Sequence, residues 1–412
     1  MAWDYITHMS LNNRLTVLYG SSGGHHEIGN TKEMEDFART HPVNNVTFIP
    51  VKPSFVSKDY GFSLLGIRGF YKEYRRWHEE VFHKIEKLLA ESEYDIIHFL
   101  GPIGYHEPGI LYNLPIPYIW GPVGGIVKVP FPLLLYGDLK YGGHEGIKIV
   151  FKALISRNRL FANHRVKKAM RRSDVVVTAT TGNNRIIKQA IGKKHHSIIK
   201  YLPENCIKEL SDLDYSKFDS EVIKLIFVGR LDAGKAPLII LESLNKLGDV
   251  KKQFHLDVLG DGPLMEASKE YVRKHDLDSI VSFRGVVERS QVFNLLRKSH
   301  LMVLPSLCDA NTTVVWEAMA QAVPTICLDH CGMHDTIKST SGIRIPIANY
   351  QKVIDAFASS FKRIASRPCI LKEMAENLLT DRKEYTWERR MELFEDFYSL
   401  AQSQYKNRTQ TN

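Results

Sequence analysis

Short apolar runs rich in β-branched residues alternate with longer amphipathic segments along this chain, and no other feature constrains its fold as strongly. In the first half, strands are predicted at 15–19, 46–51, 96–99, 118–120, 175–178 and 198–200. In the second half, they are predicted at 225–228, 255–259, 281–284, 301–304 and 325–328. Helices are predicted at about 28–40, 70–92, 158–172, 237–247, 264–275, 289–297 and 313–321. This alternation is typical of α/β folds in which helices cover parallel sheets.

A polar, charged stretch at 210–222 separates two such series. With 412 residues the chain is long enough for two domains of ordinary size. We therefore expect two doubly wound domains, the first over 10–215 and the second over 216–385, preceded by a loose N-terminal extension. In such folds ligands bind at the carboxyl ends of the strands, so the sequence predicts a site in a central cleft between the domains.

Composition limits the classes of partner. Up to residue 215, 28 lysines and arginines stand against 21 acidic residues, which accounts for most of the net charge of +9. A basic half suits anionic lipid or a phosphorylated substrate, and no zinc finger, RNA-recognition signature or basic arm favours nucleic acid.

Five cysteines form an odd, sparse set typical of a reducing cytoplasm. Cys327, His330, Cys331 and His334 lack the spacing of a zinc site, so no metal is expected.

A cationic loop follows the first strand of the second series. It carries Arg230 and Lys235, which offer phosphate oxygens a planar fork and a compact charge. Such a pair would be as often two solvated loop cations if it stood alone. Two later strand ends, at 259–263 and 283–286, contain glycines that would let backbone near Gly262 and Val286 approach a ligand.

Two carboxylates give the strongest indication of a ligand-binding site in the sequence. Asp309 follows a predicted buried strand, and Glu317 lies in the next helix. Between them Asn311, Thr312 and Thr313 stand where that helix begins, so free backbone N–H groups there can bind an anion. Carboxylates also accept hydrogen bonds from sugar hydroxyls. The alternative, in which both acids are ordinary surface charges, is weakened by the apolar neighbours of Glu317.

In this order the motifs resemble glycosyltransferase family 4, a retaining group with the GT-B fold of two Rossmann-like domains. The resemblance covers roughly 224–345 and rests on G-R-x₄-K, G-D-G-P, F-x-G, L-P-S and an acid followed by x₇-E-A-M-A. In that family the arginine and lysine hold the donor diphosphate, the first acid holds the transferred sugar and the second holds the ribose. The resemblance assigns these catalytic roles to Arg230, Lys235, Asp309 and Glu317. The expected donor-binding set also includes Gly262, Val286, Asn311, Thr312 and Thr313.

Some positions depart from the family pattern. Asp309 stands where the usual residue is Glu, Thr312 where many members have Gly, and Ala322 at the glycine of G-x-P. The aspartate keeps the charge but shortens its reach by one methylene group, so the identity of the donor sugar is left open.

The first half carries further marks of the family. The turn at 20–26 resembles the loop that approaches the donor phosphates, which assigns Gly23 and Gly24 to donor binding. A D-I-I-H strand end and the W-G-P-V-G-G stretch at 120–125 also resemble family members. A helix at 386–405 resembles the C-terminal helix that crosses back onto the first domain. The candidates for the acceptor side are His98, His106 and Glu107.

The resemblance implies a retaining transferase that moves a sugar from a nucleotide-sugar to a hydroxyl of a glycan or polyprenyl-diphosphate-linked acceptor. Surface polysaccharide or O-antigen biosynthesis is the expected setting, without a metal or cofactor. Asp309 is expected to orient the sugar, while a donor phosphate oxygen assists deprotonation of the acceptor. Two alternatives stay open: a non-hydrolysing nucleotide-sugar epimerase, and a catalytically silent nucleotide-sugar-binding protein.

Two basic segments, 68–87 and 148–172, suggest contact with an anionic membrane surface. The second contains nine lysines and arginines, no acidic residue, and apolar side chains between the cations. This combination is typical of a helix that lies in a lipid interface. The alternative is that one side of each helix packs on the core. We expect a cytoplasmic protein, peripheral at the inner face of the cell membrane, with no nucleic-acid partner.

Overall fold

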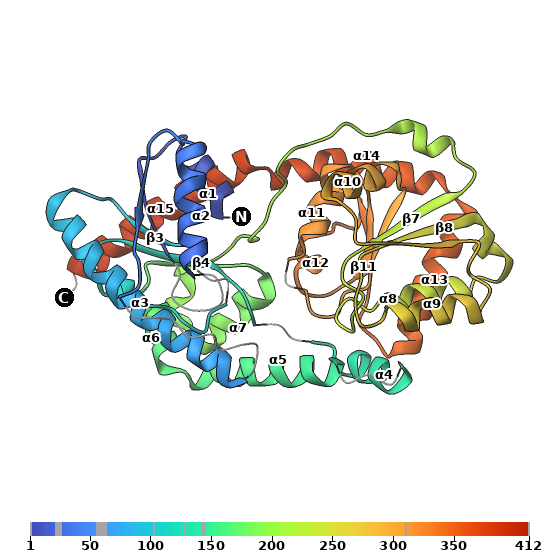
Figure 1. Ribbon diagram of the computed structural model, residues 1–412, viewed down its shortest axis with the longest axis horizontal. Coiled ribbons are helices and arrows are strands. Elements are labelled where there is room, and N and C mark those ends of the chain that lie inside the picture. Colours follow the sequence, from blue (N-terminus) through green and yellow to red (C-terminus); the bar gives the residue numbers. More distant parts are fainter. Residues whose placement is uncertain are drawn as a thin grey trace.

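The computed structural model describes residues 2–20, 27–54, 64–101, 104–126, 129–141, 145–309 and 311–410. Figure 1 shows two lobes, each built on parallel strands with helices packed around them. Among the described helices, none is both long enough and apolar enough to cross a membrane.

The first lobe contains two separate parallel sheets. Its strands are β1 (Leu15–Tyr19), β2 (Val46–Pro50), β3 (Ile97–Phe99), β4 (Tyr118–Val123), β5 (Val175–Thr178) and β6 (Ile199–Tyr201). One sheet pairs β1 with β2, and the other has the order β3-β4-β5-β6. The helices from this part of the chain are α1 (Ala2–Met9), α2 (Glu27–Thr40), α3 (Leu64–Glu91), α4 (Phe131–Tyr141), α5 (Glu145–Ala162), α6 (His164–Arg172) and α7 (Thr181–Ile191).

The second lobe has one six-stranded parallel sheet in the order β12-β11-β10-β7-β8-β9. Its strands are β7 (Ile223–Val228), β8 (Phe254–Leu259), β9 (Val281–Gly285), β10 (Leu301–Leu304), β11 (Thr325–Leu328) and β12 (Gly342–Ile345). The helices are α8 (Pro237–Asn245), α9 (Met265–Lys274), α10 (Arg289–Lys298), α11 (Thr313–Ala320), α12 (Cys331–Thr336), α13 (Tyr350–Ser366), α14 (Cys369–Asp381) and α15 (Trp387–Gln410). Every residue of β10 and β11 is buried, because helices cover both faces of the sheet.

The predicted helix at 158–172 is wrong in its bounds, because two helices meet within it. The Asn163 side chain accepts hydrogen bonds from the backbone N–H groups of Arg165 and Val166, at 3.1 and 3.2 Å. This is an N-cap, which satisfies amides that the first turn of α6 leaves without helical partners. The chain therefore ends α5 at Ala162 and starts α6 at His164.

The N-terminal segment is not the loose extension that we expected. Ala2–Met9 forms α1, which buries Tyr5, Ile6 and Met9. The Tyr5 hydroxyl donates to the backbone oxygen of Glu204 over 3.2 Å, and the Tyr5 ring packs edge-on against Phe394 of α15. The first helix thus belongs to the core of the first lobe.

The last helix also packs on the first lobe. Trp387, Met391 and Phe394 of α15 share one core cluster with residues of β4 and β5. Buried Arg390 donates to the Pro203 oxygen and to the Tyr5 hydroxyl, each over 2.5 Å. Because α14 lies against the second lobe, α15 carries the chain back across the molecule (Figure 1).

One helix from the first half of the chain lies on the second lobe. Leu133 and Leu134 of α4 belong to the core cluster of the β7 sheet. The Tyr136 ring stacks on Tyr350 with centroids 4.4 Å apart, and Lys140 Nζ lies 2.6 Å from a carboxylate oxygen of Glu242. Figure 1 shows α5 running from α4 back beneath the first lobe. The α4–α5 pair therefore forms a second connection between the lobes.

Candidate active site

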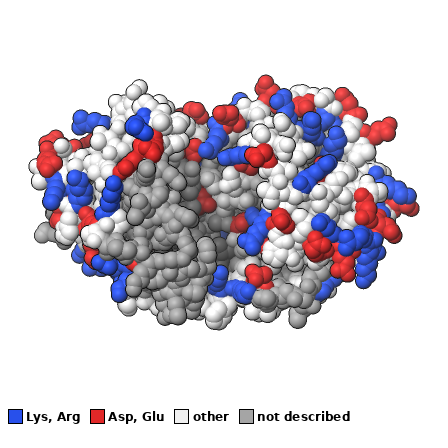
Figure 2. Space-filling model, in the orientation of Figure 1, with Lys and Arg blue, Asp and Glu red and all other residues white. Residues whose placement is uncertain are grey.

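The strand order of the second lobe reverses between β7 and β10, which are neighbours in the sheet. At such a switch point the loops after the two strands leave in opposite directions and open a crevice at the carboxyl edge. The loop after β7 carries Arg230 and Lys235, and the loop after β10 carries Asp309. Figure 2 shows the surface hollowed between the two lobes.

The structure brings Lys235 and Asp309 together at this point. Lys235 Nζ makes an ion pair with Asp309 Oδ2 and donates to Thr312 Oγ1 over 3.3 Å. The side chains of Lys235 and Asp309 are 17% and 21% exposed, so the pair is largely screened from water yet open on one side. Thr312 is the N-cap residue of α11 and Thr313 is its first residue. The cluster therefore combines a cation, an acid and the positive end of a helix.

Glu317 lies on the one polar side of α11. Every other residue of the helix is buried except Thr313, which stands four positions earlier and so on the same face. Arg289, the first residue of α10, donates to Glu317 Oε1 over 2.9 Å. This contact fixes the orientation of the carboxylate, whose side chain is 15% exposed.

Arg230 is the most open residue of the predicted diphosphate clamp. Its side chain is 67% exposed, and its Nε lies 3.5 Å from Asp232 Oδ2. An exposed pair of this kind constrains the guanidinium weakly. Arg230 is therefore free to reorient toward an anion that enters the crevice.

The glycines of the loop after β8 serve contact between loops. A Cβ on Gly260 would lie 2.0 Å from the backbone oxygen of Gly229, and one on Gly262 would lie 2.5 Å from that of Leu231. The Leu231 amide also donates to the Asp261 oxygen over 3.0 Å. Gly262 thus fixes the path of the loop that carries Arg230, while Val286 lies on the surface as a strongly exposed side chain.

Asn311 connects the two lobes. Its Nδ2 donates to the Ala179 oxygen, at the end of β5, over 2.7 Å. Nearby, Asp335 of α12 accepts hydrogen bonds from the backbone amide of Thr181, at 2.8 Å, and from the Thr181 hydroxyl. The first turn of α7 therefore meets the second lobe beside the candidate site.

His98 lies away from this cluster, within the first lobe. Its Nε2 donates to the Gly121 oxygen over 2.9 Å, and its Nδ1 accepts from the Tyr398 hydroxyl over 3.0 Å. Burial lowers the pKa of His98 to about 4, although the Gly121 hydrogen bond opposes this shift. A neutral imidazole with both nitrogens engaged joins β3 to α15, and this arrangement favours a positioning role over proton transfer.

The other acceptor-side candidates have structural partners. Glu107 is buried and pairs with Arg75, at 3.1 Å, and with Arg165. The His106 ring packs beside the ring of Tyr105, with centroids 4.1 Å apart. In segment 68–87 the structure favours the alternative to an interfacial helix, because Tyr74, Trp77 and Val81 of α3 are buried in the first core.

Thiol and metal chemistry find little support near the site. Burial raises the pKa of Cys308 to about 12, with Asp309 and Asp232 adding to the shift, so this thiol stays protonated. Within the part of the chain that the structure describes, no group of three or more His, Cys, Asp or Glu residues is arranged to hold a metal. Gly23 and Gly24 lie outside the described residues.

Sequence reasoning missed Arg289 and Asp335. Arg289 offered a signal, because a cation at the first position of a helix is disfavoured by the helix dipole unless an acid faces it. Asp335 offered none, since its partner Thr181 is more than a hundred residues away in the chain.

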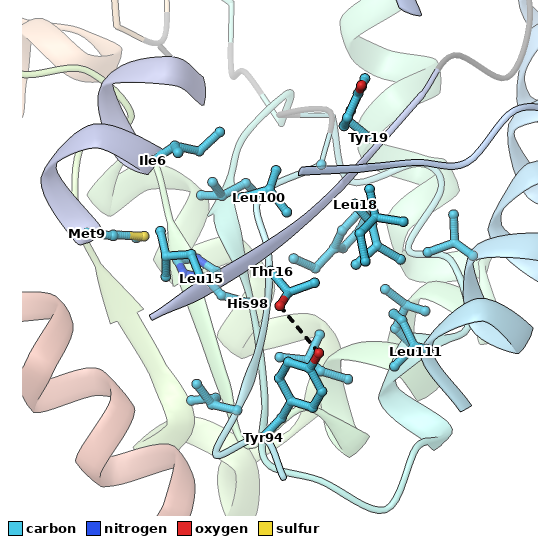
Figure 3. Close-up of a pocket in the computed structure, with 18 of the residues that line it drawn as sticks. Ile6, Met9, Leu15, Thr16, Leu18, Tyr19, Tyr94, His98, Leu100 and Leu111 are labelled. Carbon is cyan, nitrogen blue, oxygen red and sulfur yellow. Dashed lines mark hydrogen bonds between the residues drawn. The ribbon is translucent and has the colours of Figure 1, made fainter. Parts of the chain in front are cut away.

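A cavity of about 1030 Å³ lies inside the first lobe, between β1 and β3. Figure 3 shows apolar side chains around it, among them Leu15, Leu18, Leu100 and Leu111, with Thr16 and the Tyr94 hydroxyl in contact at 3.3 Å. His98 borders the cavity, whereas Lys235, Asp309 and Glu317 do not. The cavity is thus distinct from the charged crevice of the second lobe.

Comparison with known proteins matches the second lobe to a family. Residues 212–377 match the model of a family described as glycosyl transferases group 1. The alpha-D-kanosaminyltransferase of Streptomyces kanamyceticus is 25% identical over 154 residues, covering 37% of this chain and 39% of that protein. TuaC of Bacillus subtilis, a putative teichuronic acid biosynthesis glycosyltransferase, is 26% identical over 180 residues, covering 44% of this chain and 38% of that protein. The chain spans about two fifths of the length of these curated relatives.

Two solved structures resemble nearly the whole chain. HepE of Anabaena, in complex with UDP and glucose, gives a TM-score of 0.57 at 11% identity and covers 96% of this chain and 95% of its own. Sucrose-phosphate synthase of Thermosynechococcus elongatus gives 0.58 at 13% identity and covers 96% and 93%. At these identities the likeness shows the fold alone, which is GT-B with two Rossmann-like domains. The segment that matches the glycosyl transferases group 1 family contains Arg230, Lys235, Asp309 and Glu317.

Proposed function

We propose that this chain is a retaining glycosyltransferase that moves a sugar from a nucleotide-sugar donor to a hydroxyl of a glycan or lipid-linked acceptor. The Lys235–Asp309 pair carries the proposal, because it lies at the switch point of the matched domain and at the N-terminus of α11. Assembly of a surface polysaccharide, such as an O-antigen, is the proposed setting. The similarity to a putative teichuronic acid biosynthesis enzyme supports that setting.

The arrangement suits a diphosphate that becomes a leaving group. In the free protein Lys235 is paired with Asp309, Arg289 with Glu317, and Arg230 with Asp232. A diphosphate entering the crevice competes for Lys235 and Arg230 and meets the first amides of α11. As the bond to the sugar breaks, negative charge grows on the diphosphate, and fixed donors of this kind stabilise it.

Donor binding would also free Asp309. When Lys235 turns toward a phosphate oxygen, the carboxylate of Asp309 is released to accept hydrogen bonds from hydroxyls of the transferred sugar. Glu317, held by Arg289, is the proposed partner of the ribose hydroxyls. One binding event would thus arrange both ends of the donor.

The identity of the donor is tested first by measuring the binding of nucleotide sugars and then by measuring sugar transfer. A thermal-shift series with UDP-, GDP- and other activated sugars should show a raised Tm for the correct donor, because a ligand of the folded state stabilises it. The Lys235→Ala variant should lose this shift and most transfer to an added acceptor. Lys269→Ala is the matched control, because Lys269 pairs with Glu266 one helical turn away on α9.

The outcomes separate the alternatives. Formation of a sugar epimer without any acceptor would replace the proposal with an epimerase. A raised Tm without turnover on any acceptor would favour a silent binding protein. No shift with any nucleotide sugar, or equal shifts in parent and Lys235→Ala protein, would remove the proposed donor site.

A further inference from the structure

One helix exposes a stripe of large apolar side chains. On α5, Phe151, Leu154 and Phe161 are 63%, 53% and 39% exposed. Their spacing of three and seven residues places them on one side of the helix. Leu160, which faces the other way on the same helix, is buried. A surface helix normally turns such a stripe inward, and a contiguous exposed apolar patch marks a site of interaction.

Cations accompany this stripe. From Gly146 to Ser173 the sequence contains no acidic residue. Lys152 is exposed on α5, and Lys168 is exposed on α6, which packs beside it. Lys167 donates to the Phe161 oxygen over 2.7 Å, so its ammonium group lies at the carboxyl end of the stripe. Apolar side chains are thus bordered by positive charge without compensating acids on the same segment.

The stripe lies where a flat partner can reach it. Figure 1 shows α5 along the lower edge of the molecule, between the two lobes. The other basic segment of the first lobe, in α3, buries its apolar side, including Tyr74, Trp77 and Val81. Of the two basic segments, the one that contains α5 therefore keeps both apolar side chains and cations on the surface of the described residues.

We infer that the outer side of α5 is a docking surface for an anionic lipid bilayer. Phe151, Leu154 and Phe161 enter the headgroup region, while Lys152, Lys167 and Lys168 meet lipid phosphates. Charge complementarity selects this partner over a second copy of the chain, because two like-charged faces would repel each other. The inference deepens the proposed function by favouring a lipid-linked acceptor, but binding to lipid is measured without donor or turnover.

The test is sedimentation with vesicles of phosphatidylcholine alone or mixed with phosphatidylglycerol. We expect binding to the mixed vesicles at low salt and release at about 1 M salt, where the Debye length falls to about 3 Å. Phe151→Ser with Leu154→Ser should weaken partitioning by about tenfold or more, since apolar insertion is lost. Lys152→Gln with Lys168→Gln should act mainly at low salt. Leu210→Ser, which alters an exposed leucine elsewhere, is the matched control.

A second readout reports the stripe directly. Phe151→Trp should gain fluorescence quenching by brominated lipids, and the Phe151/Leu154 variant should keep the parent's melting temperature and its response to nucleotide sugars. Equal binding to neutral and mixed vesicles, no binding, or unchanged binding of the stripe variant would overturn the inference. So would a parent dimer that the stripe variant turns into a monomer, because a second copy would then cover this side. Loss of the nucleotide-sugar response in the parent would count against the proposed function alone.

Discussion

At the scale of single residues, the candidate site depends on pairs rather than on isolated charges. Asp309, Glu317 and Asp232 each face a cation in the free protein. Such pairs hold long side chains in place at little net cost, and each can exchange its internal partner for a ligand atom. Asp309 and Glu317 are therefore positioned before the donor arrives, whereas Arg230, in an exposed pair, is free to reorient.

The two acids should differ in their kinetic effects. Asp309→Asn should lower kcat, because the sugar contact strengthens as the bond to the diphosphate breaks, and a loss of about 2–4 kcal/mol is typical of such contacts. Glu317→Gln should raise KM with less change in kcat, because ribose binding is equal in ground and transition states. Arg289→Gln tests whether the role of Glu317 in ribose binding depends on its hydrogen bond with Arg289. Steady-state kinetics that show wild-type kcat in Asp309→Asn would end its assigned role.

A buried glutamate makes the stability of the first lobe depend on pH. Burial raises the pKa of Glu204 from 4.5 to about 7, although Arg390 opposes the shift. Between these values the folded state binds more protons than the unfolded state, so its stability is full below about pH 4.5 and falls as pH rises through about 7.

Glu204→Gln should remove this loss. Each pH unit between the two pKa values corresponds to about 1.4 kcal/mol, so the variant should be more stable than the parent at pH 8 and similar at pH 4. Urea unfolding at both pH values measures the difference, with exposed Glu209→Gln as the control. A parent whose stability rises steadily from pH 5 to pH 8, with no gain in Glu204→Gln, would contradict the assignment.

At the scale of elements, hydrophobic periodicity predicted strands well and connections poorly. The strands of the second lobe begin and end within about two residues of their predicted positions, because buried parallel strands are continuous apolar runs. The strand Gly342–Ile345 was missed, since Gly342 and Arg344 interrupt its apolar pattern. Nothing local indicated that α4 would leave its own lobe, because that depends on Leu133 and Leu134 meeting a distant core.

The candidate site, too, was predicted from the sequence only in part. Family motifs led to the cluster of Lys235 and Asp309, which the structure brings together from loops more than seventy residues apart. They did not indicate that His98 would have both nitrogens occupied, because Tyr398 arrives from the last helix. Contacts made by backbone atoms, such as Asn311 with Ala179, leave no trace in the sequence.

The loop after β8 gives a prediction at this scale. Gly260 has φ of +120°, and a Cβ there would meet the Gly229 oxygen at 2.0 Å. Gly260→Ala should therefore displace the Arg230 loop and destabilise the second lobe by more than about 3 kcal/mol, since neither strain nor clash can relax cheaply. Gly248→Ala is the control, because φ is +60° there and nothing lies within 4 Å of the added carbon. Thermal unfolding should rank the two variants clearly, and equal losses would contradict the packing argument.

At the scale of the whole molecule, the lobes are joined in more places than the chain between residues 202 and 222. Helix α15 returns to the first lobe, α4 docks on the second, and direct hydrogen bonds cross the crevice. These connections limit the motions by which the crevice opens to admit a donor and closes to exclude water. The contact between Asp335 and Thr181 can break without exposing either core, since it is polar.

Removing that contact should shift the molecule toward an open state. Asp335 accepts two hydrogen bonds at the N-terminus of α7, and bonds to a charged group contribute about 1.5–3 kcal/mol each. Asp335→Ala should therefore raise the radius of gyration measured by small-angle X-ray scattering, and donor binding should restore part of the change. Asp355→Ala is the matched control, because Asp355 pairs with Lys246 within the second lobe. If Asp335→Ala scatters like the parent with and without donor, then the other connections, α4, α15 and the Asn311–Ala179 hydrogen bond, suffice to hold the lobes together.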